Sequence, residues 1–361
     1  MSRARYAALG LVALIAVGCG APAPEPAPEP EPEADAAPDP PQFAVTGEHP
    51  CDPVGEVRFI CDMVSPEDIA VIPGAEWAIA SGAREGGRIH LLNVADKTST
   101  LLYPTPSSEH RLDAERYPNC PGPLDLAEAE TSRPHGLYLD PGPGSIHTLL
   151  VVHHGPRESI EFFEVDAGGE QPTLTWTGCA VAPEGANLNS VVALPGGGFA
   201  TTNAGIGVWE WHADSGWEVI PGSEDTAANG IEVSADGEVL YIAGWAEEKL
   251  TRLSRGRTPM EKEVIQLGFR PDNLRMALDG SVIFAAGHTD RDGNSITDPR
   301  EPTLETSNVA AIDPETLEFE RILVQPAMAG FIASTTAIQI GDEMWLGSYR
   351  GDRLAYLPAP E

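Results

Sequence analysis

Residues 229–244 read NGIEVSADGEVLYIAG, and this stretch contains the pattern that decides the fold. A short segment with alternating apolar side chains, Gly230 to Val233, leads into an Asp-Gly turn at Asp236. A second apolar segment follows, from Val239 to Ala243. Two such segments on either side of an Asp-Gly turn predict a β-hairpin.

The same strand-turn-strand unit returns along the chain, at intervals of roughly 40 to 70 residues. Units of that length, made of strands and tight turns, are typical of propeller blades, each of which must stack on its neighbours to bury its faces. We therefore predict an all-β fold, a six-bladed β-propeller. The six units begin at Glu67, His135, Asn189, Asn229, Asn273 and Thr336.

One domain, residues 43–361, is expected to contain all six blades. The 37 glycines agree with many hairpin turns, and no long capped stretch with helical periodicity competes with them. Closed propellers often complete their last sheet with a strand from the other terminus. Residues 56–60, EVRFI, are the candidate for that strand.

The chain begins with a segment that reads as an export signal, residues 1–18. Arg3 and Arg5 precede an apolar run too short to span a bilayer, and the run ends at Gly18-Cys19. The tetrapeptide Ala16 to Cys19 resembles a bacterial lipobox, which implies lipidation of Cys19 after cleavage. An ordinary secretory signal with an incidental cysteine is the alternative.

Residues 19–42 are predicted to be a tether. From Ala21 onward they are almost wholly Ala, Pro, Glu and Asp, a composition that cannot bury apolar surface and favours extended chain. We expect an exported lipoprotein that contacts the membrane through its lipid only. Gly20 after the lipidated cysteine favours the periplasmic face of the outer membrane or the cell surface.

The net charge of −33 excludes nucleic acid as a partner. It also disfavours strongly anionic substrates.

Four cysteines remain beyond Cys19, namely Cys51, Cys61, Cys120 and Cys179. An exported protein permits disulfides, so two bridges are expected, with three possible connectivities. Free buried thiols are the alternative. No C-x-x-C pair exists, so zinc or thioredoxin-like chemistry has no support in the sequence.

A polar residue begins nearly every predicted blade, just ahead of an apolar strand. Because the first strand of each propeller blade lines the central channel, equivalent positions on successive blades converge. Five of these residues offer only hard oxygen ligands, which favours Ca²⁺ over zinc or copper. The predicted ligands are Glu67, Asn189, Asn229, Asp272 and Asn273. Asn and Asp are also ordinary turn residues, so a set of turns without a metal is the alternative.

At these residues the chain resembles the paraoxonase/arylesterase family and, more distantly, the gluconolactonase and strictosidine-synthase-like propellers. The similarity runs from Cys61 to Tyr356. The matching segments are SPEDIAVIP (65–73), RPHGLYLD (133–140), LLVVHH (149–154), NLNSVVAL (187–194), ANGIEVSADGEVLYIA (228–243) and RPDNLRM (270–276).

This resemblance implies that the five ligands hold a catalytic calcium, with His135 and His154 as a nearby histidine pair and His288 as a further active-site histidine. It also implies a second, structural calcium, but of that site's side chains only Asp68 is kept. Strand alternation lets only one of His153 and His154 face the channel, and the resemblance favours His154.

The function that the resemblance implies is a calcium-dependent lactonase or arylesterase that acts on a small neutral ester or lactone. Calcium would polarise the carbonyl, and His135 would act as general base, with His154 orienting it or passing the proton outward. A sugar lactonase is a narrower alternative. The competing class is a non-catalytic surface propeller that binds a ligand or protein, with a purely structural calcium. No G-x-S-x-G, H-E-x-x-H, P-loop or G-x-G-x-x-G motif supports another chemistry.

Overall fold

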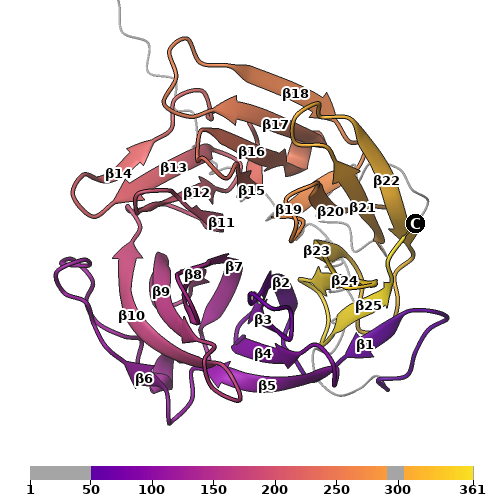
Figure 1. The fold of residues 1–361 in the computed structure, drawn as a ribbon, viewed down its shortest axis with the longest axis horizontal. Helices are drawn as coiled ribbons and strands as arrows, with labels where there is room; N and C mark the ends of the chain where they lie inside the picture. Colours follow the sequence, from indigo (N-terminus) through magenta and orange to yellow (C-terminus); the bar gives the residue numbers. More distant parts are fainter. Residues whose placement is uncertain (1–49, 291–304, 361) are drawn as a thin grey trace, which may run out of the picture. The chain divides into compact units, whose positions relative to one another are not determined.

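The computed structural model describes residues 50–290 and 305–360, all within the unit Pro41–Glu361. In this unit six sheets follow one another around a ring, as Figure 1 shows down the axis, and all but one of them are purely antiparallel. The prediction of a six-bladed β-propeller is confirmed. The signal (1–18), Cys19 and the tether (19–42) lie outside the described residues.

Each blade runs from an innermost strand beside the axis to an outermost strand at the rim. Blade 1 contains β2 (Pro66–Val71), β3 (Trp77–Gly82), β4 (Ile89–Asn93) and β5 (Thr98–Tyr103). Blade 2 contains β7 (Arg133–Asp140), β8 (Ile146–His154), β9 (Ser159–Asp166) and β10 (Thr173–Val181), and the short β6 (Glu109–His110) pairs parallel to β10. Blade 3 contains β11 (Leu188–Ala193), β12 (Phe199–Asn203), β13 (Gly207–His212) and β14 (Gly216–Val219).

The second half of the ring repeats this arrangement. Blade 4 contains β15 (Ala228–Val233), β16 (Val239–Gly244), β17 (Lys249–Ser254) and β18 (Lys262–Gln266). Blade 5 contains β19 (Arg270–Met276), β20 (Ile283–Thr289), β21 (Thr306–Ile312) and β22 (Phe319–Gln325). Blade 6 contains β23 (Ser334–Ile340), β24 (Glu343–Ser348) and β25 (Leu354–Pro358).

The ring is closed by the strand expected from EVRFI. β1 (Arg58–Ile60) pairs antiparallel with β25 as the outermost strand of blade 6, and Figure 1 shows the two side by side. Two disulfides are present, and they select one of the three possible connectivities. Cys51 bonds to Cys61 beside β1, and Cys120 bonds to Cys179 on β10.

The hydrophobic core lies between adjacent blades. Leu149 and Phe163 of blade 2 pack with Ile79 and Leu91 of blade 1, and the other blade interfaces are built in the same way. Because both faces of each sheet are covered, strands such as β20 are buried along their whole length. Each blade therefore depends on both neighbours for its stability.

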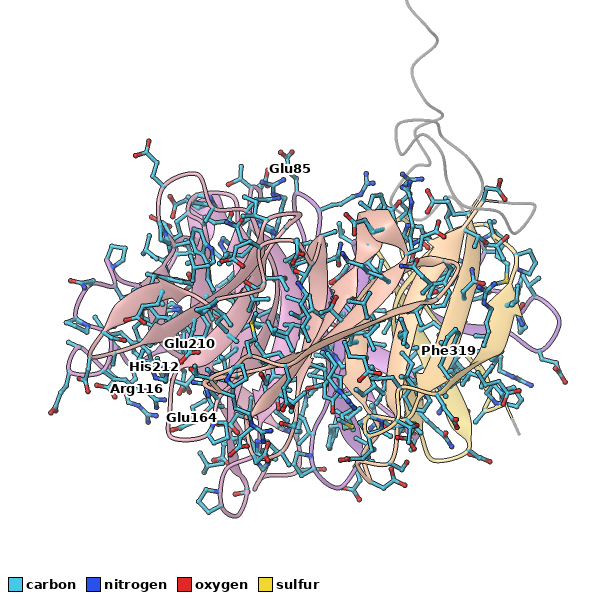
Figure 2. The ribbon with its side chains drawn as sticks, turned by 90° about the horizontal axis from the view of Figure 1, so that it is seen from above. Glu85, Arg116, Glu164, Glu210, His212 and Phe319 are labelled. Carbon is cyan, nitrogen blue, oxygen red and sulfur yellow. A yellow bond between two sulfur atoms is a disulfide. The ribbon has the colours of Figure 1, made fainter. Side chains whose placement is uncertain are left out.

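Helix is confined, among the described residues, to two short 3₁₀ turns, η1 (Leu126–Glu128) and η2 (Trp245–Glu247). None of the described helices is long or apolar enough to cross a membrane. Figure 2 shows the ring from the side, with Glu85 projecting at one face. Glu85 lies in the connection from β3 to β4, at the end of the channel where β2 begins.

Candidate active site

Every innermost strand carries a β-bulge at the same place. In blade 1 Pro66 pairs with Gly82 and Ile69 with Ala80, so two residues oppose the single Ser81. The same two-against-one register occurs in the other five blades. Bulges of this kind re-aim side chains and are common next to active sites. The bulged pairs are Glu67-Asp68, His135-Gly136, Asn189-Ser190, Asn229-Gly230, Asp272-Asn273 and Thr335-Thr336.

All five predicted calcium ligands, and His135, are therefore bulge residues. Close backbone contacts bring neighbouring bulges to the same level of the channel. A Cβ at Gly136 would lie 2.4 Å from the carbonyl oxygen of Asn189, and a Cβ at Gly230 would lie 2.1 Å from that of Asp272. On the other side of the ring, Thr335 Oγ1 donates a hydrogen bond to the Glu67 carbonyl, 2.6 Å away.

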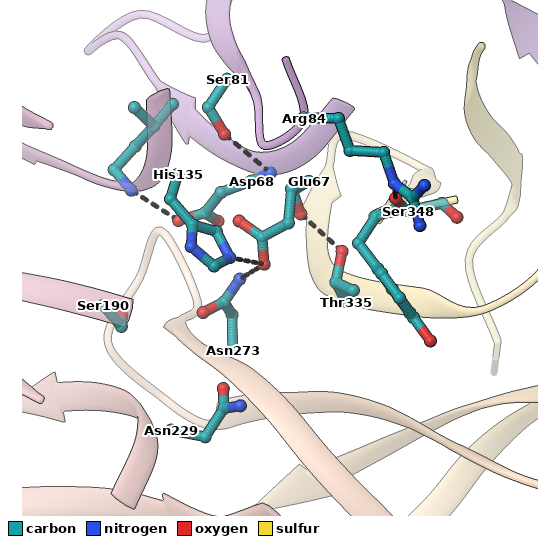
Figure 3. A network of polar contacts seen from close by, with 12 residues as sticks. Glu67, Asp68, Ser81, Arg84, His135, Ser190, Asn229, Asn273, Thr335 and Ser348 are labelled. Atoms are coloured by element: carbon teal, nitrogen blue, oxygen red, sulfur yellow. Dashed lines mark hydrogen bonds and ion pairs between the residues drawn. The ribbon is translucent and has the colours of Figure 1, made fainter. Parts of the chain in front are cut away.

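Glu67 is the most buried charged member of the set, with 1% of its surface exposed. Its Oε1 accepts a hydrogen bond from Asn273 Nδ2 and lies 3.8 Å from His135 Nε2. Figure 3 shows these three side chains meeting at one point, with the Asn229 amide directed toward them.

Four side-chain oxygens in this set are buried and lack a hydrogen-bond partner among the described residues. They are Oε2 of Glu67 and the Oδ1 atoms of Asn189, Asn229 and Asn273. Buried polar atoms in proteins are nearly always hydrogen-bonded, so four exceptions in one place need an explanation.

The two acids of the set carry unfavourable charge. Burial raises the pKa of Glu67 well above its usual range, and the negative charges of Asp68 and Asp272 raise it further. Burial also raises the pKa of Asp272 well above its usual range, with Asp68 and Glu305 adding to the effect. Both carboxylates would be stabilised by a cation between them.

Unpaired hard oxygens and excess negative charge fit Ca²⁺, which takes six to eight oxygen ligands and is often held by carboxylates and amides together. The described residues contain no group of three or more His, Cys, Asp or Glu arranged to hold a metal. The candidate set is of another composition, with three asparagines and two acids.

His135 and His154 are in direct contact, with 2.9 Å between His135 Nδ1 and His154 Nε2. His154 Nδ1 in turn lies 2.7 Å from Glu158 Oε2. Burial, the neighbouring His154 and Arg133 together lower the pKa of His135 to about 3. Burial therefore disfavours the charged form of His135.

His153 points the other way from its neighbour, as strand alternation requires. Its Nε2 lies 2.9 Å from Ser132 Oγ and its Nδ1 lies 3.3 Å from the Arg157 carbonyl. It is a packed histidine of blade 2, and His154 is the one that reaches His135.

His288 belongs to a separate group beside the candidate metal site. It is 1% exposed, and its Nε2 accepts a hydrogen bond from Trp245 Nε1 at 3.1 Å. The same nitrogen lies 3.4 Å from Glu305 Oε2. Burial, Arg350 and Arg270 lower the pKa of His288 to about 3. Glu305 connects the two groups, because its charge also acts on Asp272.

Asp68, the one remaining side chain of the expected second calcium site, has other partners. Its Oδ2 accepts hydrogen bonds from the Arg275 guanidinium and from Leu137 N, and its Oδ1 accepts one from Ile69 N. Arg275 also donates to the carbonyls of Ile69, Leu137 and Leu274. A buried guanidinium thus supplies the positive charge next to Asp68.

Sequence reasoning missed Glu158 and Arg275. Arg275 could have been identified from the sequence, because it is a charged residue within the apolar part of a predicted innermost strand. Glu158 carried none, because it sits in a turn ahead of β9 and its partners come from β8 and blade 3.

No family model matches the chain, and neither does any curated protein by sequence. Among solved structures it is similar to a presumed gluconolactonase, at 15% identity and a TM-score of 0.51, over 84% of this chain and 92% of that one. It is also similar to a luciferin-regenerating enzyme, at 12% identity and a TM-score of 0.50, over 85% and 95%.

A third similar structure is Raptor from Chaetomium thermophilum, at 10% identity and a TM-score of 0.50, over 84% of this chain and 28% of that one. At such identities these likenesses show the fold alone, and proteins of quite different names share it. The function must be argued from the site.

Proposed function

We propose that this protein is a calcium-dependent hydrolase of lactones or aryl esters, similar to the paraoxonase/arylesterase family. The gluconolactonase-type propeller among its structural neighbours is consistent with a lactonase-like enzyme. The proposed ligands are the five bulge residues Glu67, Asn189, Asn229, Asp272 and Asn273. The proposed catalytic histidines are His135, His154 and His288.

One observation carries the proposal: four unpaired buried oxygens lie beside a pair of hydrogen-bonded histidines. A purely structural ion needs only the oxygens. General-base hydrolysis needs in addition an imidazole close to the metal site, and His135 Nε2 lies 3.8 Å from Oε1 of the proposed ligand Glu67.

When bound, calcium supplies a Lewis acid that polarises the substrate carbonyl and stabilises the negative charge developing on its oxygen. His135 accepts a proton from water at Nε2, which makes that water nucleophilic. His154 holds the His135 ring in place through Nδ1. His288, buried next to Trp245, borders the same site and orients the bound ester.

The first test is hydrolysis of phenyl acetate and a panel of γ-, δ- and sugar lactones by the purified protein, with calcium and with chelator. We expect turnover with calcium and its loss with chelator. His135→Gln and Asn229→Ala should each lower kcat/KM by roughly 10²-fold or more, because each removes a group that acts on the transition state.

Matched controls come from the third strands of two blades, β13 and β4. His212, which pairs with Glu210, and Asn93, which accepts a hydrogen bond from Asp96 N, are far from the bulges in their own blades. Figure 2 shows His212 and Glu210 close together. His212→Gln and Asn93→Ala should keep full activity. No turnover by a folded, calcium-loaded protein across the panel would favour a binding propeller with a structural ion.

We also propose that the chain is an exported lipoprotein, anchored through Cys19 at the outer membrane or cell surface. The test is metabolic labelling with a fatty acid analogue in a bacterial host. Incorporation that Cys19→Ala abolishes supports the proposal, and an unlabelled exported protein contradicts it.

A further inference from the structure

A chain of hydrogen bonds leads from the candidate metal site toward solvent. It runs from His135 through His154 to Glu158, whose side chain is 23% exposed. The other carboxylate oxygen of Glu158, Oε1, accepts the backbone N–H of Leu188 at 2.5 Å. Leu188 is the residue just before the proposed ligand Asn189.

When both imidazoles are uncharged, the hydrogen-bonding capacity of these groups determines where each proton sits. A carboxylate only accepts hydrogen bonds, so His154 must donate through Nδ1–H. A neutral imidazole has one N–H, which leaves His154 Nε2 as an acceptor. His135 must then donate through its own Nδ1–H. Its lone pair is therefore on Nε2, the nitrogen that lies 3.8 Å from Glu67 Oε1.

We propose that Glu158 is a positioning residue that sets the tautomer of both histidines and so presents the basic nitrogen of His135 to the metal site. This inference rests on the proposed function and adds a residue to it. Glu158 touches neither substrate nor metal and acts through His154.

In the proposed reaction His135 Nε2 takes a proton from water, and the hydroxide oxygen bonds to the carbonyl carbon. The bond from that carbon to the leaving oxygen then breaks, and the leaving oxygen takes the proton back from Nε2. Meanwhile the carboxylate of Glu158 stabilises the positive charge shared by the two imidazoles. The products are an acid and an alcohol, and the histidines return to their first tautomers.

Glu158→Gln tests this without removing a hydrogen bond. The Gln carbonyl keeps the contact with Leu188 N–H, so its amide NH₂ faces His154 and donates. His154 Nδ1 must then accept, which turns the whole chain around and puts the proton of His135 on Nε2. The base is lost while the geometry is kept.

The experiment measures kinetics and tautomers on the same samples. We expect Glu158→Gln to lower kcat by roughly 10²- to 10⁴-fold, the range for general-base catalysis, with KM and calcium affinity within about threefold of the wild type. Long-range ¹H–¹⁵N spectra of histidine-labelled protein should show Nδ1–H on His154 in the wild type and Nε2–H in the variant.

The matched control is Glu164→Gln on β9. Glu164 accepts a hydrogen bond from Arg111 at the surface of the same blade and has no contact with the histidines. The Glu164→Gln variant should keep the wild-type kcat and the wild-type histidine spectra. A Glu158→Gln enzyme with wild-type kcat, or a wild-type His154 protonated on Nε2, overturns the inference. If the wild type hydrolyses nothing, the proposed function fails, and the spectra still decide the role of Glu158.

Discussion

At the scale of single residues, the site combines buried charge with missing partners. Glu67 and Asp272 are almost completely buried. The charge of Asp272 raises the pKa of Glu67, and the charge of Asp68 raises the pKa of both. Such carboxylates oppose folding unless a cation compensates them. The presence of two such carboxylates in one buried site is therefore better explained by metal binding than by stability.

The variant Asp272→Asn separates the contribution of Asp272 to metal binding from its contribution to the stability of the fold. Without metal, we expect the variant to be more stable than the wild type by about 1–3 kcal/mol, since an uncompensated buried charge has been removed. With calcium at 100 times its wild-type Kd, the wild type should gain about 2.7 kcal/mol and the variant less. Urea unfolding with calcium and with chelator measures both. A variant less stable than the wild type in chelator contradicts the account.

For Arg275 we predict that substitution lowers the stability of the protein, in contrast to Asp272→Asn. It is the guanidinium partner of Asp68, and both side chains are buried. Arg275→Met should destabilise the protein by about 3–5 kcal/mol, because it leaves the Asp68 carboxylate buried and unpaired. Adding Asp68→Asn should recover a large part of that loss. Denaturant unfolding of the two single variants and the double variant measures the coupling, and additive effects would refute it.

At the scale of the element, the bulge is the feature that builds the site. A regular strand would direct neighbouring residues to opposite faces, whereas the bulge of β19 lets both Asp272 and Asn273 serve one site. Gly230 permits the approach of the next bulge, because any side chain there would meet the backbone of β19.

We therefore predict that Gly230→Ala will weaken calcium binding by roughly tenfold or more, which corresponds to about 1.4 kcal/mol. The added Cβ would lie 2.1 Å from the Asp272 carbonyl oxygen and 2.8 Å from Asn273 Cα, so β19 has to move. Gly169→Ala is the control, because its nearest neighbour would be 3.4 Å away on an exposed turn. Calorimetric titration gives the affinities, and equal values for the two variants would argue against the role of the bulge.

Part of the fold and of the candidate site could be predicted from the sequence alone. The strand-turn-strand repeat predicted six blades and the strand that closes them, because blade periodicity is a local pattern. Polar residues at the start of each unit identified the candidate ligands for the same reason. The bulges were not predictable, since an inserted residue looks like ordinary alternation until the partner strand is known. Glu158 and its contact with Leu188 depend on how blades 2 and 3 pack, which no local pattern encodes.

At the scale of the whole molecule, the ring has no central core of its own. Apolar clusters fill the spaces between blades, and the axis is left to polar bulge residues. The site thus sits where all six blades meet, and no blade holds it alone. Metal affinity and ring integrity should therefore change together in variants that loosen any blade interface.

The closure of the ring has a mechanical consequence. Cys51 and Cys61 lie on either side of β1, so their disulfide bridges the ends of the segment that contains it. A pulling force applied to the chain ahead of Cys51 is transmitted through the disulfide directly to Cys61. β1 then lies in a slack loop and bears no load. Once the disulfide is reduced, the same pull acts on β1 itself and peels it from β25, one hydrogen bond at a time.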